Sequence, residues 1–371
     1  MSGALDGLLV VALEQAVAAP LSSSRLADAG ARVIKIERPG GDFARGYDDV
    51  VHGESAYFVW LNRGKESIIL DLKLCADKAL MERMLDKADI YIQNLATGAA
   101  ERLGFCSETW RARRPELITC DISGYGDTGP YAGMKAYDLL VQAESGLASI
   151  TGSKDEIGRV GVSVCDITAG MNAHAALLEA LIVKGKTGVG RGIKVSLFDG
   201  MADWMTVPLL HFDYGGVAPV RAGLHHPSIA PYGAYAYDGG EVLISIQNDR
   251  EWRAFAESVL ENTVLGDDPR FSTNLARVAN RSALDSVIAA EFGTLDCDRL
   301  LVRFGLARTA FGRLNEVAGL SSHPQLRRMS IETSSGPVEM PAPPAQSDNM
   351  PAPGPVPAPG QHSDAIRREF S

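Results

Sequence analysis

The chain has 371 residues, of which 46% are hydrophobic and 22% are charged, a composition typical of a globular protein with about two domains. Lys and Arg number 36 against 46 Asp and Glu, and the resulting formal net charge of −10 argues against a nucleic-acid binder. The five cysteines show no paired spacing, which indicates neither a zinc site nor a disulfide framework. With no secretion signal or membrane anchor visible, we expect a cytoplasmic protein.

Short apolar runs alternate with helical patterns through the first half of the chain. The runs are rich in β-branched residues and predict strands at Leu8–Leu13, Arg32–Glu37, Ser67–Leu72, Asp89–Asn94, Leu117–Ser123 and Ile193–Leu197. Helices are predicted between them at about Leu21–Ala29, Ala76–Lys87 and Ala99–Leu103. This alternation predicts an α/β fold with a parallel sheet, and such sheets bind ligands at the carboxyl ends of their strands.

Two longer helices are predicted next. Asp166–Lys184 is rich in Ala and Leu, and Gly200–Tyr214 is apolar almost all round, which predicts a buried helix. A hairpin is predicted over Tyr235–Gln247, because Gly239-Gly240 suits a tight turn. Further helices are predicted near Arg250–Glu261, Ser282–Phe292, Asp296–Phe304 and Ala365–Phe370.

The change of texture along the chain predicts its domains. Residues 1–217 form a large domain, 218–233 a Pro-, Gly- and His-containing linker and loop, and 234–320 a smaller α+β domain. The Pro-rich segment from Pro341 to Gly360 leads to the final helix, so we expect residues 321–371 to return to the large domain rather than to form a disordered linker.

Asp166 stands at the start of the first long helix, in the run VSVCDITAGMNAH. The simplest interpretation is a helix N-cap. The alternative is a nucleophile: a carboxylate at a helix N-terminus stays ionised, and it can attack a thioester while free N–H groups stabilise the oxyanion. The small Ala169 and Gly170 would then let an acyl group approach. The neighbouring Cys165 fits a small buried residue better than a second nucleophile.

Isolated polar or basic residues follow several of the predicted strands. Each alone is explained by surface charge, but together they would line the carboxyl edge of the sheet with groups suited to phosphates. They are Arg38, Lys73, Asn94, Arg102 and Lys135.

Two loops carry weaker signals. The loop GYGDTGPYAG at Gly124–Gly133 lacks the endings of a nucleotide-binding fingerprint and is typical of a turn-rich loop. His225-His226-Pro227 has no second ligand pair at a fitting distance, so we expect an active-site loop and no metal.

Five motifs in order resemble the family III CoA-transferases, the group that contains formyl-CoA transferase, carnitine CoA-transferase and α-methylacyl-CoA racemase. The resemblance spans almost the whole chain, and it rests on LDGLLVVALEQAVAAPLSSSRLADAGARVIKIERPGGD, LNRGKESIILDLK, DIYIQNLATGAAERLG, AYDLLVQAESGL and VCDITAGMNA.

The resemblance implies a Rossmann-like large domain and an interlocked homodimer with ring-like chains. It implies that Asp166 is the nucleophile and that coenzyme A, a substrate rather than a resident cofactor, contacts Arg38, Leu70, Asp71, Leu72, Lys73, Asn94, Leu95, Arg102, Lys135 and Tyr137. Contacts to the transferred acids are expected at Val17, Tyr137, Asp138, Gln142, His225 and His226. The partners expected are acyl-CoA, a carboxylic acid and a second copy of the chain, with neither nucleic acid nor membrane.

The departures from the family pattern bear on the reaction. The racemases have a His-Asp pair where this chain has Tyr137-Asp138, which favours transfer. A loop with His225-His226 in place of glycines resembles transferases that use succinyl-CoA and C4–C5 dicarboxylates such as itaconate, mesaconate or citramalate, and makes oxalate doubtful. A 2-methylacyl-CoA racemase and a CoA-binding regulatory homologue remain the alternatives.

Overall fold

The computed structural model describes residues 3–346, 348 and 351–371. The chain divides into two compact units. The first joins the segment up to Leu147 with Val160–Val207 and the segment from Arg327 onward, and the second joins Ala148–Arg159 with Pro208–Leu326. The domain limits derived from the sequence stay a prediction beside this division.

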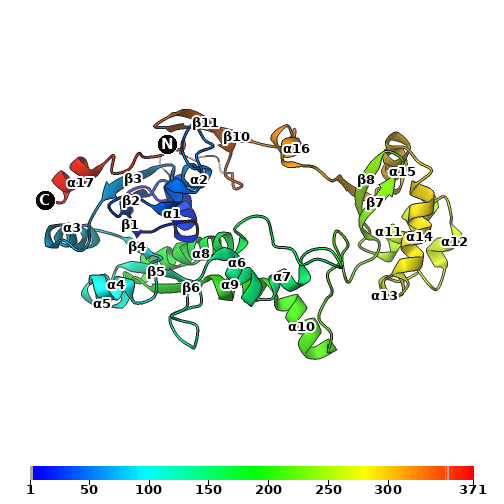
Figure 1. Ribbon diagram of the computed structural model, residues 1–371, viewed down its shortest axis with the longest axis horizontal. Coiled ribbons are helices and arrows are strands. Elements are labelled where there is room, and N and C mark those ends of the chain that lie inside the picture. Colours follow the sequence, from blue (N-terminus) through cyan, green and yellow to red (C-terminus); the bar gives the residue numbers. More distant parts are fainter. Residues whose placement is uncertain (1–2, 347, 349–350) are drawn as a thin grey trace. The chain divides into compact units, whose positions relative to one another are not determined.

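The first unit is built on a six-stranded sheet in the order β3-β2-β1-β4-β5-β6, with all neighbours parallel (Figure 1). All six strands that the sequence predicts are confirmed: β3 begins two residues and ends three residues earlier than expected, and the bounds of the other strands differ by at most one residue. Their bounds are β1 Leu9–Leu13, β2 Arg32–Glu37, β3 Lys65–Ile69, β4 Ile90–Gln93, β5 Ile118–Ser123 and β6 Gly192–Ser196.

Alternate residues of each strand enter cores on opposite faces of the sheet. Val10 and Ala12 pack with helices α1 (Ala18–Asp28) and α8 (Val164–Thr187). Val11 and Leu13 pack on the other face against α3 and the chain's last helix. The helices of this face and of the connections are η1 Phe43–Gly46, α2 Ala56–Asn62, α3 Cys75–Leu85, α4 Ala99–Leu103, α5 Ser107–Arg113, α6 Asp138–Glu144 and α17 Ser363–Glu369. Helix α7 (Leu147–Ile150) follows α6, and all of it but Leu147 belongs to the second unit.

The prediction of one buried helix over Gly200–Tyr214 is wrong. The segment forms α9 (Leu197–Trp204) and α10 (Thr206–Gly215), which are separated at Met205. No residue of α10 is buried, and the side chain of Phe212 is 57% exposed. An apolar pattern predicts that a helix is covered, but it does not specify whether the same chain or another surface covers it. In this structure the rest of the chain does not bury α10.

The C-terminal segment from Arg327 onward belongs to the first unit. After the hairpin of β10 (Arg328–Thr333) and β11 (Gly336–Pro341), the Pro355 carbonyl accepts a hydrogen bond from the Gly64 N–H at 2.8 Å. Helix α17 then lies beside β3, where the His362 N–H donates to the Ser67 carbonyl. Positions 347, 349 and 350 of the Pro-rich segment lie outside the described residues.

The second unit packs helices around a three-stranded antiparallel sheet. Its hairpin of β7 (Tyr232–Tyr237) and β8 (Gly240–Ser245) turns at the predicted Gly239-Gly240, and β9 (Ala310–Arg313) adds a strand that the sequence did not reveal. Its helices are α11 Asp249–Ser258, α12 Val264–Asp267, α13 Asn274–Ala279, α14 Arg281–Phe292, α15 Cys297–Ala307 and α16 Val317–Ser321. Over the described residues, no helix has both the length and the apolar character needed to cross a membrane.

Candidate active site

The order of the strands selects one place on the carboxyl edge of the sheet. β2 lies on one side of β1 and β4 on the other, so the connections after β1 and β4 leave toward opposite faces. Parallel sheets bind ligands in the crevice that opens at such a switch point. The segments that meet there are Glu14–Val17 after β1 and the residues from Asn94 after β4.

Asn94 fixes the turn between β1 and α1. Its Oδ1 accepts from the Gln15 N–H at 2.9 Å, and its Nδ2 donates to the Gln15 carbonyl at 2.8 Å. Val17 follows as the N-cap of α1 and is 3% exposed. The side-chain amide of Asn94 therefore bonds to the protein itself at the edge where the resemblance implies a CoA contact.

Asp166 lies in the first turn of α8, and the N-cap of this helix is Ser163. The interpretation of Asp166 as an N-cap is therefore wrong. A different carboxylate satisfies this helix end: Asp138, the first residue of α6, accepts the Cys165 N–H through Oδ1 at 2.7 Å. Because Asp138 bonds to the first turn, Asp166 is left without this task, and no described residue donates a hydrogen bond to its carboxylate.

Burial, and after it the nearby negative charge of Asp138, together raise the pKa of Asp166 to about 7. This shift runs against the expectation that the helix N-terminus keeps the carboxylate ionised, because burial disfavours the charged form. A carboxylate with a pKa near neutral and no hydrogen-bond donor is less stabilised as an anion and is therefore a better nucleophile when ionised.

Asp138 and Gln142 form a fixed support beside Asp166. Gln142 is fully buried, donates from Nε2 to Asp138 Oδ2 at 2.6 Å, and accepts the Val160 N–H at 2.9 Å. Tyr137, by contrast, is 65% exposed and free to contact a ligand. Of the three residues expected to contact the transferred acids here, Asp138 and Gln142 are held by bonds within the protein.

Sequence reasoning missed Tyr47 and Tyr57, whose rings pack edge to face at 5.4 Å. The pKa of Tyr47 rises to about 12 through burial and then through the charges of Asp42 and Asp166. This places Tyr47 within electrostatic range of Asp166. A lone Tyr after a short apolar pattern carries no signal for this role, because the contact depends on the folded path of the chain.

Gly170 serves packing rather than access for an acyl group. A Cβ at this position would lie 2.6 Å from the Ala18 carbonyl oxygen, so α1 and α8 come close only because residue 170 is Gly. Ala169 is fully buried. The acyl-approach hypothesis for this pair is therefore wrong. The close packing instead brings Val17 of the β1–α1 turn into one apolar cluster with Ile167, next to Asp166.

The residues expected to contact CoA lie along the carboxyl edge. Exposed cations follow β2, β3 and β5, and another lies on α4 after β4: Arg38, Lys73, Lys135 and Arg102. The Arg38 guanidinium lies 5.6 Å from the centre of the Phe43 ring. Beside Lys73, the side chains of Leu70 and Leu72 are buried in the core, while Asp71 and Leu95 are partly exposed. Lys73, Asp71 and Leu95 are thus accessible, and the buried leucines offer only backbone.

The loop with His225 and His226 belongs to the second unit and is tightly bonded there. The His226 ring stacks on Tyr232 at 5.3 Å, and burial together with Arg281 lowers its pKa. This shift favours the neutral ring, so His226 would not add a positive charge beside a bound carboxylate. Arg221, which lies just before this loop, donates to three backbone carbonyls in the segment Ser149–Lys154.

The fold is that of a Rossmann-like α/β protein whose ligand edge lies beside a desolvated carboxylate. The chain belongs to CoA-transferase family III, whose family model matches residues 5–363, and it is a CoA-transferase. In the part of the chain that the structure describes, no group of three or more His, Cys, Asp and Glu residues could hold a metal ion.

Curated relatives cover most of the chain. It is 36% identical to an acetyl-CoA:oxalate CoA-transferase of Acetobacter aceti, over 100% of this chain and 96% of that one. It is 33% identical to a succinate–glutarate CoA-transferase of Agrobacterium fabrum, over 90% and 86%, and 34% identical to a succinyl-CoA:mesaconate CoA-transferase of Haloarcula hispanica, over 81% and 77%.

Solved structures confirm the fold. A CaiB/BaiF family protein from Brucella suis superposes with a TM-score of 0.84 at 34% identity, covering 100% of both chains. A protein of Mycobacterium tuberculosis reaches a TM-score of 0.86 at 24% identity, covering 98% of this chain and 99% of that one, and shows the fold alone.

Proposed function

We propose that this chain moves CoA from an acyl-CoA to a second carboxylic acid by way of covalent intermediates on Asp166. The observation that carries the proposal is the partly buried carboxylate of Asp166, whose pKa is about 7, at the first turn of α8. Its position beside the switch-point turn supports attack on a thioester bound at the carboxyl edge.

The steps balance without a metal or a redox reagent. Asp166 attacks the thioester carbonyl, the C–S bond breaks, and an aspartyl anhydride and CoA thiolate result. The thiolate attacks the aspartyl carbonyl, expels the donor acid and forms an aspartyl-CoA thioester. The acceptor carboxylate then displaces the thiolate to give a new anhydride, and the thiolate attacks the acceptor's carbonyl to release the product and free Asp166. Holding the thiolate in place makes its return unimolecular.

For the donor and acceptor we propose succinyl-CoA and a C4–C5 dicarboxylate such as itaconate, mesaconate or citramalate. Support comes from relatives whose names specify succinyl-CoA with mesaconate or with D-citramalate, the latter 31% identical. The relative named for acetyl-CoA and oxalate is 36% identical, so the sequence argument against oxalate loses its force. What these acids share is a second carboxylate.

A panel of acyl-CoA donors and acids, read by mass spectrometry, tests this choice. We expect the highest kcat/KM with succinyl-CoA and a C4–C5 dicarboxylate, and lower values with oxalate and with monocarboxylates. If the His225-His226 loop contacts the acceptor, replacing both by Ala raises the acceptor KM and leaves the affinity for free CoA unchanged. Preference for oxalate, or for an acid with one carboxylate, contradicts the assignment.

For CoA itself we propose contacts from the cations of the carboxyl edge. Replacing Arg38 or Lys135 by Ala should weaken CoA binding by about 1–3 kcal/mol, the range of a charge-assisted hydrogen bond. Isothermal calorimetry measures the change. Arg113 is the matched control, since it is an exposed Arg at the end of α5, before the amino end of β5, and pairs with Asp86. If all three variants bind CoA with equal affinity, Arg38 and Lys135 are ordinary surface charges that do not contact CoA.

We also propose the homodimer that the resemblance implies. Its support is α10, whose exposed apolar side chains would be covered by a second chain. They are Val207, Leu209, Leu210, Phe212 and Tyr214. Light scattering should give twice the mass of one chain, and replacing Phe212 by Asp should shift it toward one chain. A monomeric wild type contradicts the proposal.

A further inference from the structure

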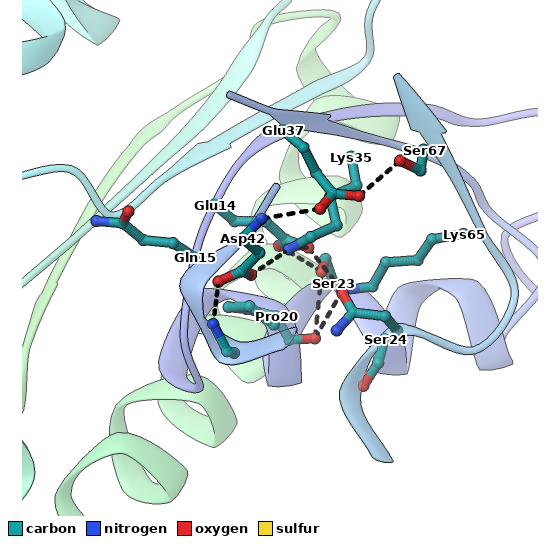
Figure 2. Close-up of polar contacts among 12 residues, drawn as sticks. Glu14, Gln15, Pro20, Ser23, Ser24, Lys35, Glu37, Asp42, Lys65 and Ser67 are labelled. Atoms are coloured by element: carbon teal, nitrogen blue, oxygen red, sulfur yellow. Dashed lines mark hydrogen bonds and ion pairs between the residues drawn. The ribbon is translucent and has the colours of Figure 1, made fainter. Parts of the chain in front are cut away.

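Charged side chains are buried together beneath the switch-point turn (Figure 2). We call Glu14, Lys35, Asp42 and Lys65 the buried ion cluster; none is more than 4% exposed. Lys35 Nζ lies 2.9 Å from Asp42 Oδ2 and 3.4 Å from Glu14 Oε1, while Lys65 Nζ lies 2.6 Å from the same Glu14 oxygen. Ser23 donates to Glu14, and Lys65 also donates to the Pro20 carbonyl and to Asn62 Oδ1.

Such a cluster is not explained by stability alone. Withdrawing charges from water is costly, and apolar residues of similar size stabilise a core at least as well. The three strands nearest to it, β1, β2 and β3, already bury continuous apolar faces. Glu14 directly follows β1 and Asp42 follows β2, while Lys35 lies within β2 and Lys65 begins β3. The two carboxylates of the cluster therefore lie at the carboxyl edge of the sheet.

Asp42 extends the cluster to the surface of the site through the backbone. Its Oδ2 bonds to Lys35, while its Oδ1 accepts the N–H of Ala16 at 3.2 Å and the N–H of Ala44 at 3.0 Å. Ala16 has φ +62°, a left-handed conformation that an L-residue other than Gly adopts only at a cost. The Asp42 bond therefore holds a turn that the chain would otherwise relax.

The two backbone segments that Asp42 holds, at Ala16 and Ala44, each carry a residue that lies near Asp166. On one side, Ala16 precedes Val17, which packs in the apolar cluster with Ile167. On the other side, Asp42 is the N-cap of η1, and Tyr47 is the C-cap of the same helix. The negative charge of Asp166 contributes to the raised pKa of the Tyr47 phenol. One carboxylate thus fixes two backbone segments near the proposed nucleophile: one places Val17 in the apolar cluster with Ile167, and the other carries Tyr47.

We propose that Asp42, anchored by Lys35, is a positioning residue for CoA transfer: it holds Ala16 in its left-handed conformation and caps η1, and so places Val17 and Tyr47 against Asp166. Asp42 touches no substrate in this role. The inference rests on the proposed function, because it takes Asp166 as the nucleophile. Misplacing groups by about 1 Å can lower turnover by roughly a hundred-fold, so the effect belongs to kcat.

Steady-state kinetics of full-length variants test the inference, with substitutions at Asp42 and Ala16. Asp42→Ala should lower kcat roughly ten-fold or more and change the KM for acyl-CoA less than about three-fold. Adding Ala16→Gly should restore part of the lost kcat, because Gly adopts a positive φ without help. In the wild-type background, where Asp42 is present, Ala16→Gly should not raise kcat. Loss of packing alone would not produce this dependence.

Two further variants keep the test decisive. Asp28→Asn is the matched control, since Asp28 bonds to the buried Arg63 guanidinium at the other end of α1, and it should keep wild-type kcat. Asp42→Asn keeps an acceptor oxygen for the two N–H groups, so it should lose less kcat than Asp42→Ala, and it serves if Asp42→Ala does not fold. The inference is overturned if the Asp42 variants have the same kcat as Asp28→Asn. It is also overturned if Ala16→Gly does not raise kcat when added to Asp42→Ala.

The two proposals fail separately. If Asp166→Ala keeps its turnover, the nucleophile is wrong and the proposed function fails with it. If Asp166→Ala is inactive while folded Asp42 variants turn over like Asp28→Asn, only the positioning role is lost.

Discussion

Replacing Asp166 by Ala is expected to lower CoA transfer at least roughly a thousand-fold, because the nucleophile that carries both covalent intermediates is gone. The protein should stay folded. No described residue donates a hydrogen bond to the carboxylate, and the first turn of α8 is held by Asp138 through the Cys165 N–H. Steady-state turnover with purified protein, checked by circular dichroism, measures both.

Cys165 is the matched control for this substitution. It is adjacent in sequence, fully buried, and its Sγ donates to the Asp138 carbonyl at 3.3 Å. Burial raises the pKa of its thiol well above the usual range, so it stays protonated at neutral pH. Cys165→Ala should therefore keep most of the activity. Near-normal turnover by Asp166→Ala, or loss of turnover in the Cys165 variant alone, contradicts the aspartate mechanism.

The second large effect is a pH dependence. The nucleophile is the ionised form of Asp166, and burial raises its pKa to about 7. The kcat/KM should thus be level above about pH 8 and fall about ten-fold per unit below 7, reaching roughly a hundredth at pH 5. A carboxylate of ordinary pKa would give a level profile from pH 5 to 9. Such a profile in the wild type would contradict the claim that burial raises the pKa of Asp166.

The same pKa has a consequence for stability. Since folding raises the pKa of Asp166, the folded protein disfavours its ionised form, and wild type loses stability as pH rises from about 4 to 7. Asp166→Asn does not ionise, so it should be more stable than wild type by up to about 3 kcal/mol at pH 8, with a smaller gain at pH 5. Chemical denaturation at the two pH values measures the difference, and an Asn variant that is equally or less stable at pH 8 contradicts it.

The sequence was sufficient for the elements whose pattern is local. The run RVIKIE has the alternation and β-branching of a strand, and β2 covers those residues. Because all the strands that follow are parallel, the cations after them had to meet at one edge, whatever the details of packing. The family motif likewise pointed to Asp166 before its surroundings were known.

What the sequence could not give depends on distant contacts. Asp42 meets Ala16 only when the turn after β1 folds beside the start of η1, so neither residue carries a signal by itself. The pKa of Asp166 depends on how deeply α8 is buried, and the N-cap pattern alone favoured the opposite result. The apolar pattern of α10 predicted a buried helix, but no residue of α10 is buried in the structure, because an apolar pattern does not specify which surface covers it.

The most direct test of the account is to find where CoA is carried during turnover. The protein is incubated with succinyl-CoA without acceptor, quenched in acid, digested and analysed by mass spectrometry. The aspartate mechanism predicts CoA attached as a thioester to the peptide that contains Asp166, lost on addition of the acceptor acid and absent from Asp166→Ala. Transfer that proceeds with no adduct, or with an adduct on another residue such as Cys165, would contradict it.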